Sequence, residues 1–161
     1  MNLIIATKLL PHSSSRYGAE IDALILHYPA PNLEDPNPYS TNAVHALLDR
    51  EKLSYHYFID KEGLITQFVD TDRAAWHAGK ALLFGATNVN QRSIGICLAN
   101  NGGEPYRKEQ LKAAGDLCRY LSENFRIPMN RIVGHVHVSP DRKVDPGPKF
   151  PWYEFFRDYM A

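Results

Sequence analysis

The chain has few cysteines, no net charge and no long apolar run, and each of these absences excludes a class of protein. Its two cysteines, Cys97 and Cys118, lack CxxC spacing, which excludes a disulfide scaffold. Eighteen basic residues balance eighteen acidic ones, so no overall field attracts the chain to nucleic acid or to an anionic membrane. No stretch approaches the roughly 20 apolar residues of a membrane span. Any partner must therefore be recognised locally.

The amino terminus lacks the features of a secretory signal. The segment MNLIIATKLLPHSSS has a short apolar patch that Lys8 interrupts, and it has neither a basic start nor a small-residue cleavage site. By default we expect a cytoplasmic protein, which could leave the cell only by a route that needs no such signal. The length of 161 residues predicts one domain over residues 1–161, with residues 1–20 as an amino-terminal extension.

Short apolar runs alternate with helical patterns along the chain. Strands are expected at residues 23–26, 55–59, 64–69, 93–99 and 131–134. Helices are expected at residues 41–51, 108–125 and 152–160. Gly63 ends a turn that would join two of the strands as a hairpin, and residues 70–92, which lack a steady period, predict a long functional loop. The pattern predicts an α/β fold, with a central mixed sheet of about five or six strands flanked by helices.

Residues 134–148, GHVHVSPDRKVDPGP, hold the densest set of chemically active side chains. His27 and His135 each follow a predicted strand, and neighbouring strands would bring both imidazoles to one edge of the sheet. Asp145 could return to the same point because the prolines of the loop fix φ. Two histidines and a carboxylate, with a fourth position open, form the ligand set of a catalytic zinc site. Spacing alone leaves a second interpretation open, in which the histidines are structural and the loop is simply a turn.

Several segments resemble those of a known family. They are LILHY at 24–28, SYHYFIDKEG at 54–63, AAWHAG at 74–79, SIGICL at 93–98 and GHVHVSPDRKVDPGPKFPW at 134–152. In this order they resemble the zinc-dependent N-acetylmuramoyl-L-alanine amidases, which include enzymes of the AmpD type, small phage amidases and peptidoglycan recognition proteins. The resemblance covers about residues 20–155. It implies the recognition-protein fold and hydrolysis of the amide bond between N-acetylmuramic acid and L-alanine in peptidoglycan or anhydro-muropeptides.

The resemblance also implies roles for particular residues. His27, His135 and Asp145 would bind Zn²⁺, which gives hydroxide from bound water at neutral pH. Lys143 would face the scissile carbonyl and stabilise the oxyanion. Tyr55 would orient the attacking water or help to deprotonate it.

Further positions fall near the family's substrate groove. Trp76, His77 and Asn90 are predicted to bind substrate, although a packing role is an alternative for Trp76. His137 is a rival metal ligand because it forms a His-x-His pair with His135, but the family uses only the first histidine of this pair.

One position departs from the AmpD-like pattern. That branch has glutamate, thought to be the general base, where this chain has Cys97. Small phage amidases also have a non-acidic residue there, so the resemblance implies that Tyr55 and Lys143 are sufficient. Cys97 itself is expected to be a small buried residue. Its presence leaves a non-catalytic peptidoglycan-binding module as an alternative, and a hydrolase of another acyl-amide is a third hypothesis. Oligomeric state and the choice between polymeric and soluble substrate are left open.

Overall fold

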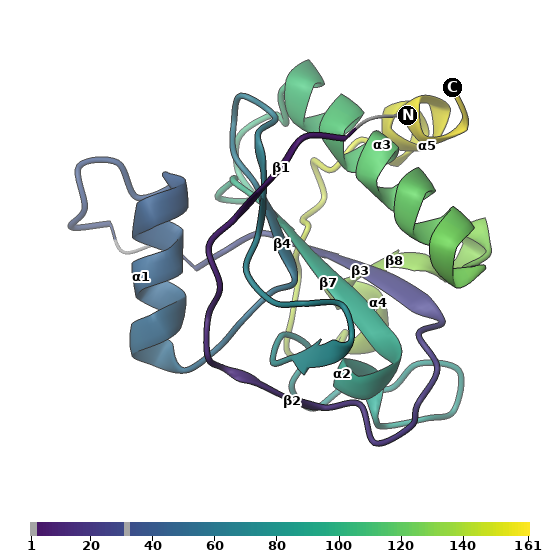
Figure 1. Cartoon of the computed structure of the whole chain (residues 1–161). Helices are drawn as coiled ribbons and strands as arrows, with labels where there is room; N and C mark the ends of the chain where they lie inside the picture. The colour runs from purple at the N-terminus through teal and green to yellow at the C-terminus, as the bar shows by residue number, and fades with distance from the viewer. Residues whose placement is uncertain (1–2, 31–32) are drawn as a thin grey trace.

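A six-stranded mixed sheet forms the centre of the computed structural model, which describes residues 3–30 and 33–161 (Figure 1). Across the sheet the strands are β1 (Ile5–Thr7), β5 (Ile65–Gln67), β4 (Tyr57–Ile59), β7 (Ser93–Leu98), β3 (Ala23–His27) and β8 (Ile132–Gly134). The neighbouring strands β4, β7, β3 and β8 pair in parallel, whereas β5 pairs antiparallel with β4. The predicted α/β fold with a mixed central sheet is therefore confirmed.

Helices flank the sheet on both faces (Figure 1). The longer ones are α1 (Thr41–Glu51), α3 (Lys108–Phe125) and α5 (Trp152–Met160), and the short ones are α2 (Val89–Arg92), η1 (Met129–Arg131) and α4 (His135–Val138). Alternate side chains of β3 point to opposite faces of the sheet. Leu24 and Leu26 pack in the core beneath α3 and α5. Ile25 packs on the opposite face with residues of α2 and α4. His27 follows Ile25 by two positions and shares that second face.

The predicted helix at residues 41–51 begins and ends as expected. Ser40 Oγ accepts a hydrogen bond from the backbone N–H of Ala43 at 3.1 Å, which satisfies one of the free amides of the first turn. Val44 and Leu48 of α1 pack in one cluster with Phe58 of β4. The helix therefore covers the half of the second face that lies over β4 and β7.

The predicted hairpin is also present, with shorter strands than the sequence indicates. β4 and β5 pair antiparallel, and Gly63 in their turn has a φ of +83°. Tyr55 and His56 precede β4 rather than lying within it. Both remain next to the sheet, because the backbone N–H of His56 donates to the carbonyl of Gly95 in β7 at 3.0 Å.

Two segments hold more regular structure than the sequence predicts. The predicted extension, of which residues 1–2 lie outside the described residues, supplies β1 at the sheet edge and β2 (Ser13–Ser15). β2 pairs antiparallel with β6 (Arg73–Ala75), inside the predicted loop of residues 70–92. Strands of three residues are too short to show alternation, so periodicity did not reveal them. Among the described residues, no helix combines the length and apolar character needed to cross a membrane.

Candidate active site

His27, His135 and Asp145 meet at one end of the sheet. His27 is the last residue of β3, and His135 begins α4 directly after β8. Because β3 and β8 are parallel neighbours, both imidazoles lie at the same edge. Asp145 returns from the loop after α4, where its carbonyl accepts a hydrogen bond from the N–H of Val136 at 3.0 Å. The fold thus brings together the three residues that the sequence predicts as metal ligands.

One atom from each of these side chains faces a common centre. His27 Nδ1 lies 3.1 Å from His135 Nδ1 and 3.0 Å from Asp145 Oδ2, and His135 Nδ1 lies 3.2 Å from that same oxygen. Ligand atoms about 2.0–2.1 Å from a tetrahedral zinc ion lie about 3.3 Å from one another. The three atoms are therefore spaced like three corners of a zinc tetrahedron. All three residues are buried, and the group could hold a metal ion.

The contact made by Nε2 of His135, the ring nitrogen that points away from the common centre, determines which nitrogen is free to bind a metal. His135 Nε2 lies 3.0 Å from the carbonyl oxygen of Ala78, and only an N–H can satisfy that contact. The proton of the neutral ring is therefore on Nε2. Nδ1 keeps its lone pair and directs it to the common centre.

A chain of hydrogen bonds fixes His27 in the same way. Its Nε2 lies 2.9 Å from His77 Nδ1, and His77 Nε2 lies 3.1 Å from Ser93 Oγ. Ser93 Oγ donates to the carbonyl of Val89 at 2.6 Å, so it accepts from His77. Each imidazole then carries one proton, on Nε2, and His27 Nδ1 is left free toward Asp145 and His135.

Burial keeps the cluster in the protonation state that a metal requires. It lowers the pKa of His27 from 6.5 to about 4. Burial, and then the charges of neighbouring histidines, hold the pKa of His77 well below 6.5. Burial raises the pKa of the Asp145 carboxyl, but its contacts with His135 and His27 lower that pKa by more, to below its usual range. At neutral pH the imidazoles of His27 and His77 are therefore neutral, and the Asp145 carboxylate is ionised.

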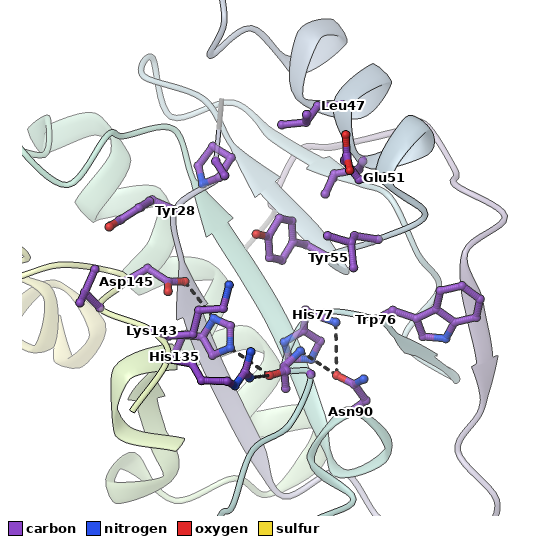
Figure 2. A pocket seen from close by; sticks show the side chains of 18 residues that line it. Tyr28, Leu47, Glu51, Tyr55, Trp76, His77, Asn90, His135, Lys143 and Asp145 are labelled. Carbon is purple, nitrogen blue, oxygen red and sulfur yellow. Dashed lines mark hydrogen bonds and ion pairs between the residues drawn. The ribbon is translucent and has the colours of Figure 1, made fainter. Parts of the chain in front are cut away.

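The cluster opens into a groove with a volume of about 410 Å³ (Figure 2). Lys143 lines it two residues before Asp145, so the loop places its ammonium beside the predicted metal ligands. The facing wall comes from the end of α1, the segment after it and Trp76, which directly follows β6. The residues of that wall include Leu47, Leu48, Glu51, Leu53, Tyr55 and Trp76.

Tyr55 lies beside the metal-ligand cluster, above Cys97. Its ring centre is 4.9 Å from that of His27, and its side chain packs against the cluster of buried residues that contains Cys97. Burial, and then the charges of Cys97 and Asp145, raise the pKa of Tyr55 well above 10, and burial raises the pKa of the Cys97 thiol likewise. Both groups therefore keep their protons at neutral pH. Cys97 is fully buried, which confirms the expectation of a small buried residue.

Comparison with known proteins agrees with this geometry. Residues 17–148 match the family described as N-acetylmuramoyl-L-alanine amidase. The chain belongs to this family. Among curated amidases of the family, the 1,6-anhydro-N-acetylmuramyl-L-alanine amidase AmpD of Haemophilus influenzae is 35% identical over 105 residues, which are 65% of this chain and 57% of that protein. AmpD of Citrobacter freundii is 33% identical over 138 residues, which are 86% of this chain and 70% of the relative.

Solved structures of amidases share the fold. A crystal structure of a Se-Met AmpD derivative has a TM-score of 0.87 and 26% identity, and the match covers 98% of this chain and 96% of that one. The Escherichia coli amidase AmiD, in complex with anhydro-N-acetylmuramic acid-L-Ala-D-gamma-Glu-L-Lys, has a TM-score of 0.74 and 28% identity. That match covers 94% of this chain and 60% of AmiD. These matches confirm the family that the sequence motifs indicate.

The three residues predicted to bind substrate differ in how far they are exposed in the groove of this amidase. Trp76 is 37% exposed on the groove wall, and its indole N–H donates to Ser14 Oγ at 3.3 Å. His77 is only 7% exposed, and both its ring nitrogens contact protein atoms. Asn90 Oδ1 accepts the backbone N–H groups of His77 and Ala78, at 3.2 and 2.8 Å. Substrate contact by these three residues stays a prediction.

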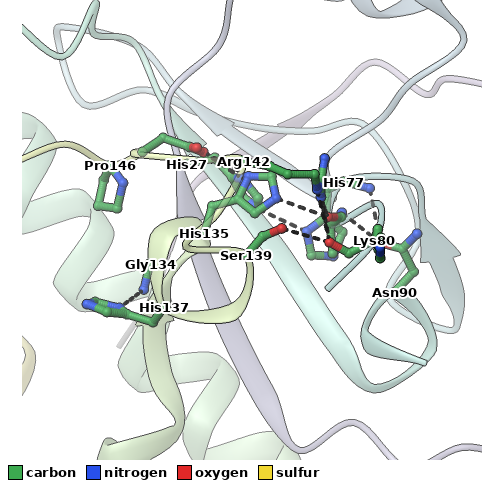
Figure 3. Close-up of polar contacts among 12 residues, drawn as sticks. His27, His77, Lys80, Asn90, Gly134, His135, His137, Ser139, Arg142 and Pro146 are labelled. Atoms are coloured by element: carbon green, nitrogen blue, oxygen red, sulfur yellow. Dashed lines mark hydrogen bonds and ion pairs between the residues drawn. The ribbon is translucent and has the colours of Figure 1, made fainter. Parts of the chain in front are cut away.

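The rival ligand His137 lies outside the cluster (Figure 3). Its Nδ1 accepts the backbone N–H of Gly134 at 2.8 Å, and its ring packs near Trp152 with centres 5.5 Å apart. The helical turn of α4 causes this, because residues two apart point in different directions on a helix. The interpretation of His137 as a ligand is therefore wrong, and the structure brings only the first histidine of the pair to the centre.

Two arginines that the sequence did not reveal support the site. Arg16, 7% exposed, donates to the carbonyls of Thr71, Gln91 and Ser93 at 2.8, 2.7 and 3.0 Å. Arg142 donates from Nη2 to the carbonyls of Ala78 and Lys80 at 3.1 and 2.6 Å (Figure 3). No sequence signal marks Arg16, because it lies in the predicted extension. Arg142 is adjacent to Lys143 in the segment of residues 134–148, and this position was the one sequence feature that could have indicated its role.

Proposed function

We propose that this chain hydrolyses the amide bond between N-acetylmuramic acid and L-alanine in peptidoglycan-derived muropeptides, with Zn²⁺ held by His27, His135 and Asp145. The observation that carries the proposal is the convergence of three buried ligand atoms at a groove, in a member of the amidase family. The names of AmpD relatives and the ligand of the AmiD complex indicate an anhydro-muropeptide as the substrate class.

The donor set fits zinc. Two neutral imidazole nitrogens and one carboxylate oxygen leave the fourth tetrahedral corner for water or substrate, as catalytic zinc sites require. When bound, the ion lowers the pKa of a coordinated water from about 15.7 to about 7 and polarises a carbonyl. The chain's own contribution is to hold the ligands in place, since both histidines have protein partners on their outer nitrogens.

Lys143 would act on the scissile carbonyl, and Tyr55 would act on the attacking water. The Lys143 ammonium, in the groove beside Asp145, would stabilise the negative charge that develops on the carbonyl oxygen. Because the pKa of Tyr55 is well above 10, its hydroxyl acts as a hydrogen-bond donor and orienting group and does not become a phenolate base at neutral pH. The raised pKa of Cys97 likewise argues against a thiolate nucleophile.

The test is to incubate purified muropeptides and intact sacculi with the protein and to separate the products by liquid chromatography with mass detection. We expect free stem peptide, no release after chelation, and recovery when zinc is added back. Comparison of the two substrates would show whether soluble fragments or polymeric wall are preferred. A protein that binds one zinc ion and cleaves neither substrate would contradict the proposal and favour a binding module, with Cys97 at the position of the missing glutamate.

A further inference from the structure

Both ligand histidines contact one short segment of the chain, His77–Ala78. His27 Nε2 contacts the ring of His77 at 2.9 Å, and His135 Nε2 donates to the carbonyl of Ala78 at 3.0 Å (Figure 3). The histidines come from different parts of the sheet, β3 and the residue after β8. Two consecutive residues therefore set the orientation of both rings.

The side chain of Asn90 holds this segment in place. Its Oδ1 accepts the backbone N–H groups of His77 and Ala78, at 3.2 and 2.8 Å. Two N–H groups that converge on one atom require an acceptor, so they determine which end of the amide faces the segment. Asn90 is itself fixed within α2, because Arg16 donates to the carbonyl of Gln91, the next residue, at 2.7 Å.

Other contacts limit where the segment can lie. A Cβ at Gly95 of β7 would come within 2.6 Å of His77 Cγ, so the imidazole lies directly on the backbone of the sheet. From the other side, Arg142 Nη2 donates to the same Ala78 carbonyl that accepts from His135. The segment is thus bounded by the sheet, by Arg142 and by the Asn90 amide, whose single oxygen accepts both backbone N–H groups of the segment.

We propose that Asn90 is a positioning residue for the metal site: its side-chain oxygen holds His77–Ala78, and that segment orients His27 and His135. The proposal rests on the proposed function, because it concerns the metal bound there. Loss of the oxygen would leave two N–H groups without a partner, and the segment would move to find another. The outer partners of ligand histidines typically contribute about 10–100-fold to metal affinity, so a shift of both partners should weaken zinc binding measurably.

The experiment measures zinc affinity directly, by titrating metal-free protein against a chromophoric chelator. Asn90→Leu removes the acceptor at similar volume, and Asn90→Asp keeps an acceptor oxygen in the same place. Asn88→Leu is the matched control, because Asn88 is exposed and makes no side-chain cap hydrogen bond. We expect Asn90→Leu to bind zinc about tenfold or more weakly, and Asn90→Asp and Asn88→Leu to stay close to wild type.

Circular dichroism of the metal-free proteins checks that each variant folds, and Asn90→Ala replaces Asn90→Leu if the leucine is not accommodated. Unchanged zinc affinity with a raised KM would overturn the proposal, since Asn90 would then contact substrate. Equal loss in Asn90→Asp and Asn90→Leu would also overturn it, because an acceptor oxygen would not be what matters.

Zinc binding and muropeptide cleavage by the wild-type protein distinguish a failure of this inference from a failure of the proposed function. A wild-type protein that binds no zinc would overturn the metal site, and the role of Asn90 with it. A wild-type protein that binds zinc but cleaves no muropeptide would contradict the proposed activity, while the affinities of the variants would still decide the role of Asn90.

Discussion

The two walls of the groove are built in different ways. On the metal-ligand wall, His27 and His135 are 0% and 4% exposed, and every ring nitrogen contacts a defined protein atom. On the α1 wall, Leu53 and Trp76 are 49% and 37% exposed and present mainly apolar surface. Metal binding depends on direction and distance to within a fraction of an ångström, whereas apolar contact depends on area. Substitutions should therefore have large effects on the first wall and small ones on the second.

The largest effect on activity is expected when a candidate metal ligand on the first wall is replaced. Asp145→Asn keeps the shape of the side chain but removes the negative charge that faces the Nδ1 atoms of both ligand histidines. We expect weakened zinc binding and a fall in activity of at least about 10³-fold, because water near its free pKa is a poor nucleophile at neutral pH. Zinc titration and muropeptide turnover would measure both. Asp141→Asn, an exposed position in the same loop, is the control and should change neither.

Lys143 tests whether the metal-ligand wall does more than bind metal. Lys143→Ala should lower kcat by about 10²–10³-fold, because it removes one stabilising group for the oxyanion. Zinc affinity should stay at the wild-type value, since Lys143 is not among the ligand atoms. The exposed Lys80→Ala, outside the groove lining, provides the control. An increase in KM with kcat unchanged would show that Lys143 binds substrate instead.

The buried histidines should also make the metal-ligand side sensitive to acid. His56 is fully buried, its Nδ1 accepts the N–H of Gly95 at 3.0 Å, and burial, then the charge of Arg16, lowers its pKa from 6.5 to about 3. The unfolded chain therefore takes up a proton below about pH 6.5 that the folded protein does not, and stability falls as pH falls.

Between about pH 7.5 and 5.0 this single group should contribute roughly 2 kcal/mol of lost stability. Chemical denaturation of metal-free wild type and His56→Asn at both pH values would measure the difference, with the variant losing less. The same pH dependence in both proteins would show that another group is responsible.

The smallest effect is expected on the α1 wall. Leu53→Ala removes part of an exposed apolar contact surface and should raise KM by about threefold to tenfold, with kcat little changed. Leu82→Ala removes a side chain of similar exposure, 57%, that does not line the groove, and should leave KM unchanged. A loss of kcat in Leu53→Ala as large as that in Lys143→Ala would remove the distinction between the two walls.

The candidate metal ligands could be predicted because local sequence patterns place them. A buried apolar run identifies β3 and so places His27 at its end, and the proline-rich loop returns Asp145 to His135. Arg16 could not be predicted in this way. Its partners lie 40 to 77 positions further along the chain, and no period or motif reports contacts of that range. The exclusion of His137 followed from the short helix α4, which the sequence pattern did not indicate.

The sequence by itself determined the fold class, the family and the identity of the candidate ligands, because these depend on residue type and on spacing along the chain. Only the tertiary structure decided how those ligands are oriented. The proton positions of His27 and His135 are set by His77 and the carbonyl of Ala78, and these are held by Asn90. Hydrogen bonds act over about 3 Å, so the groups that share them are known only when distant segments have been brought together.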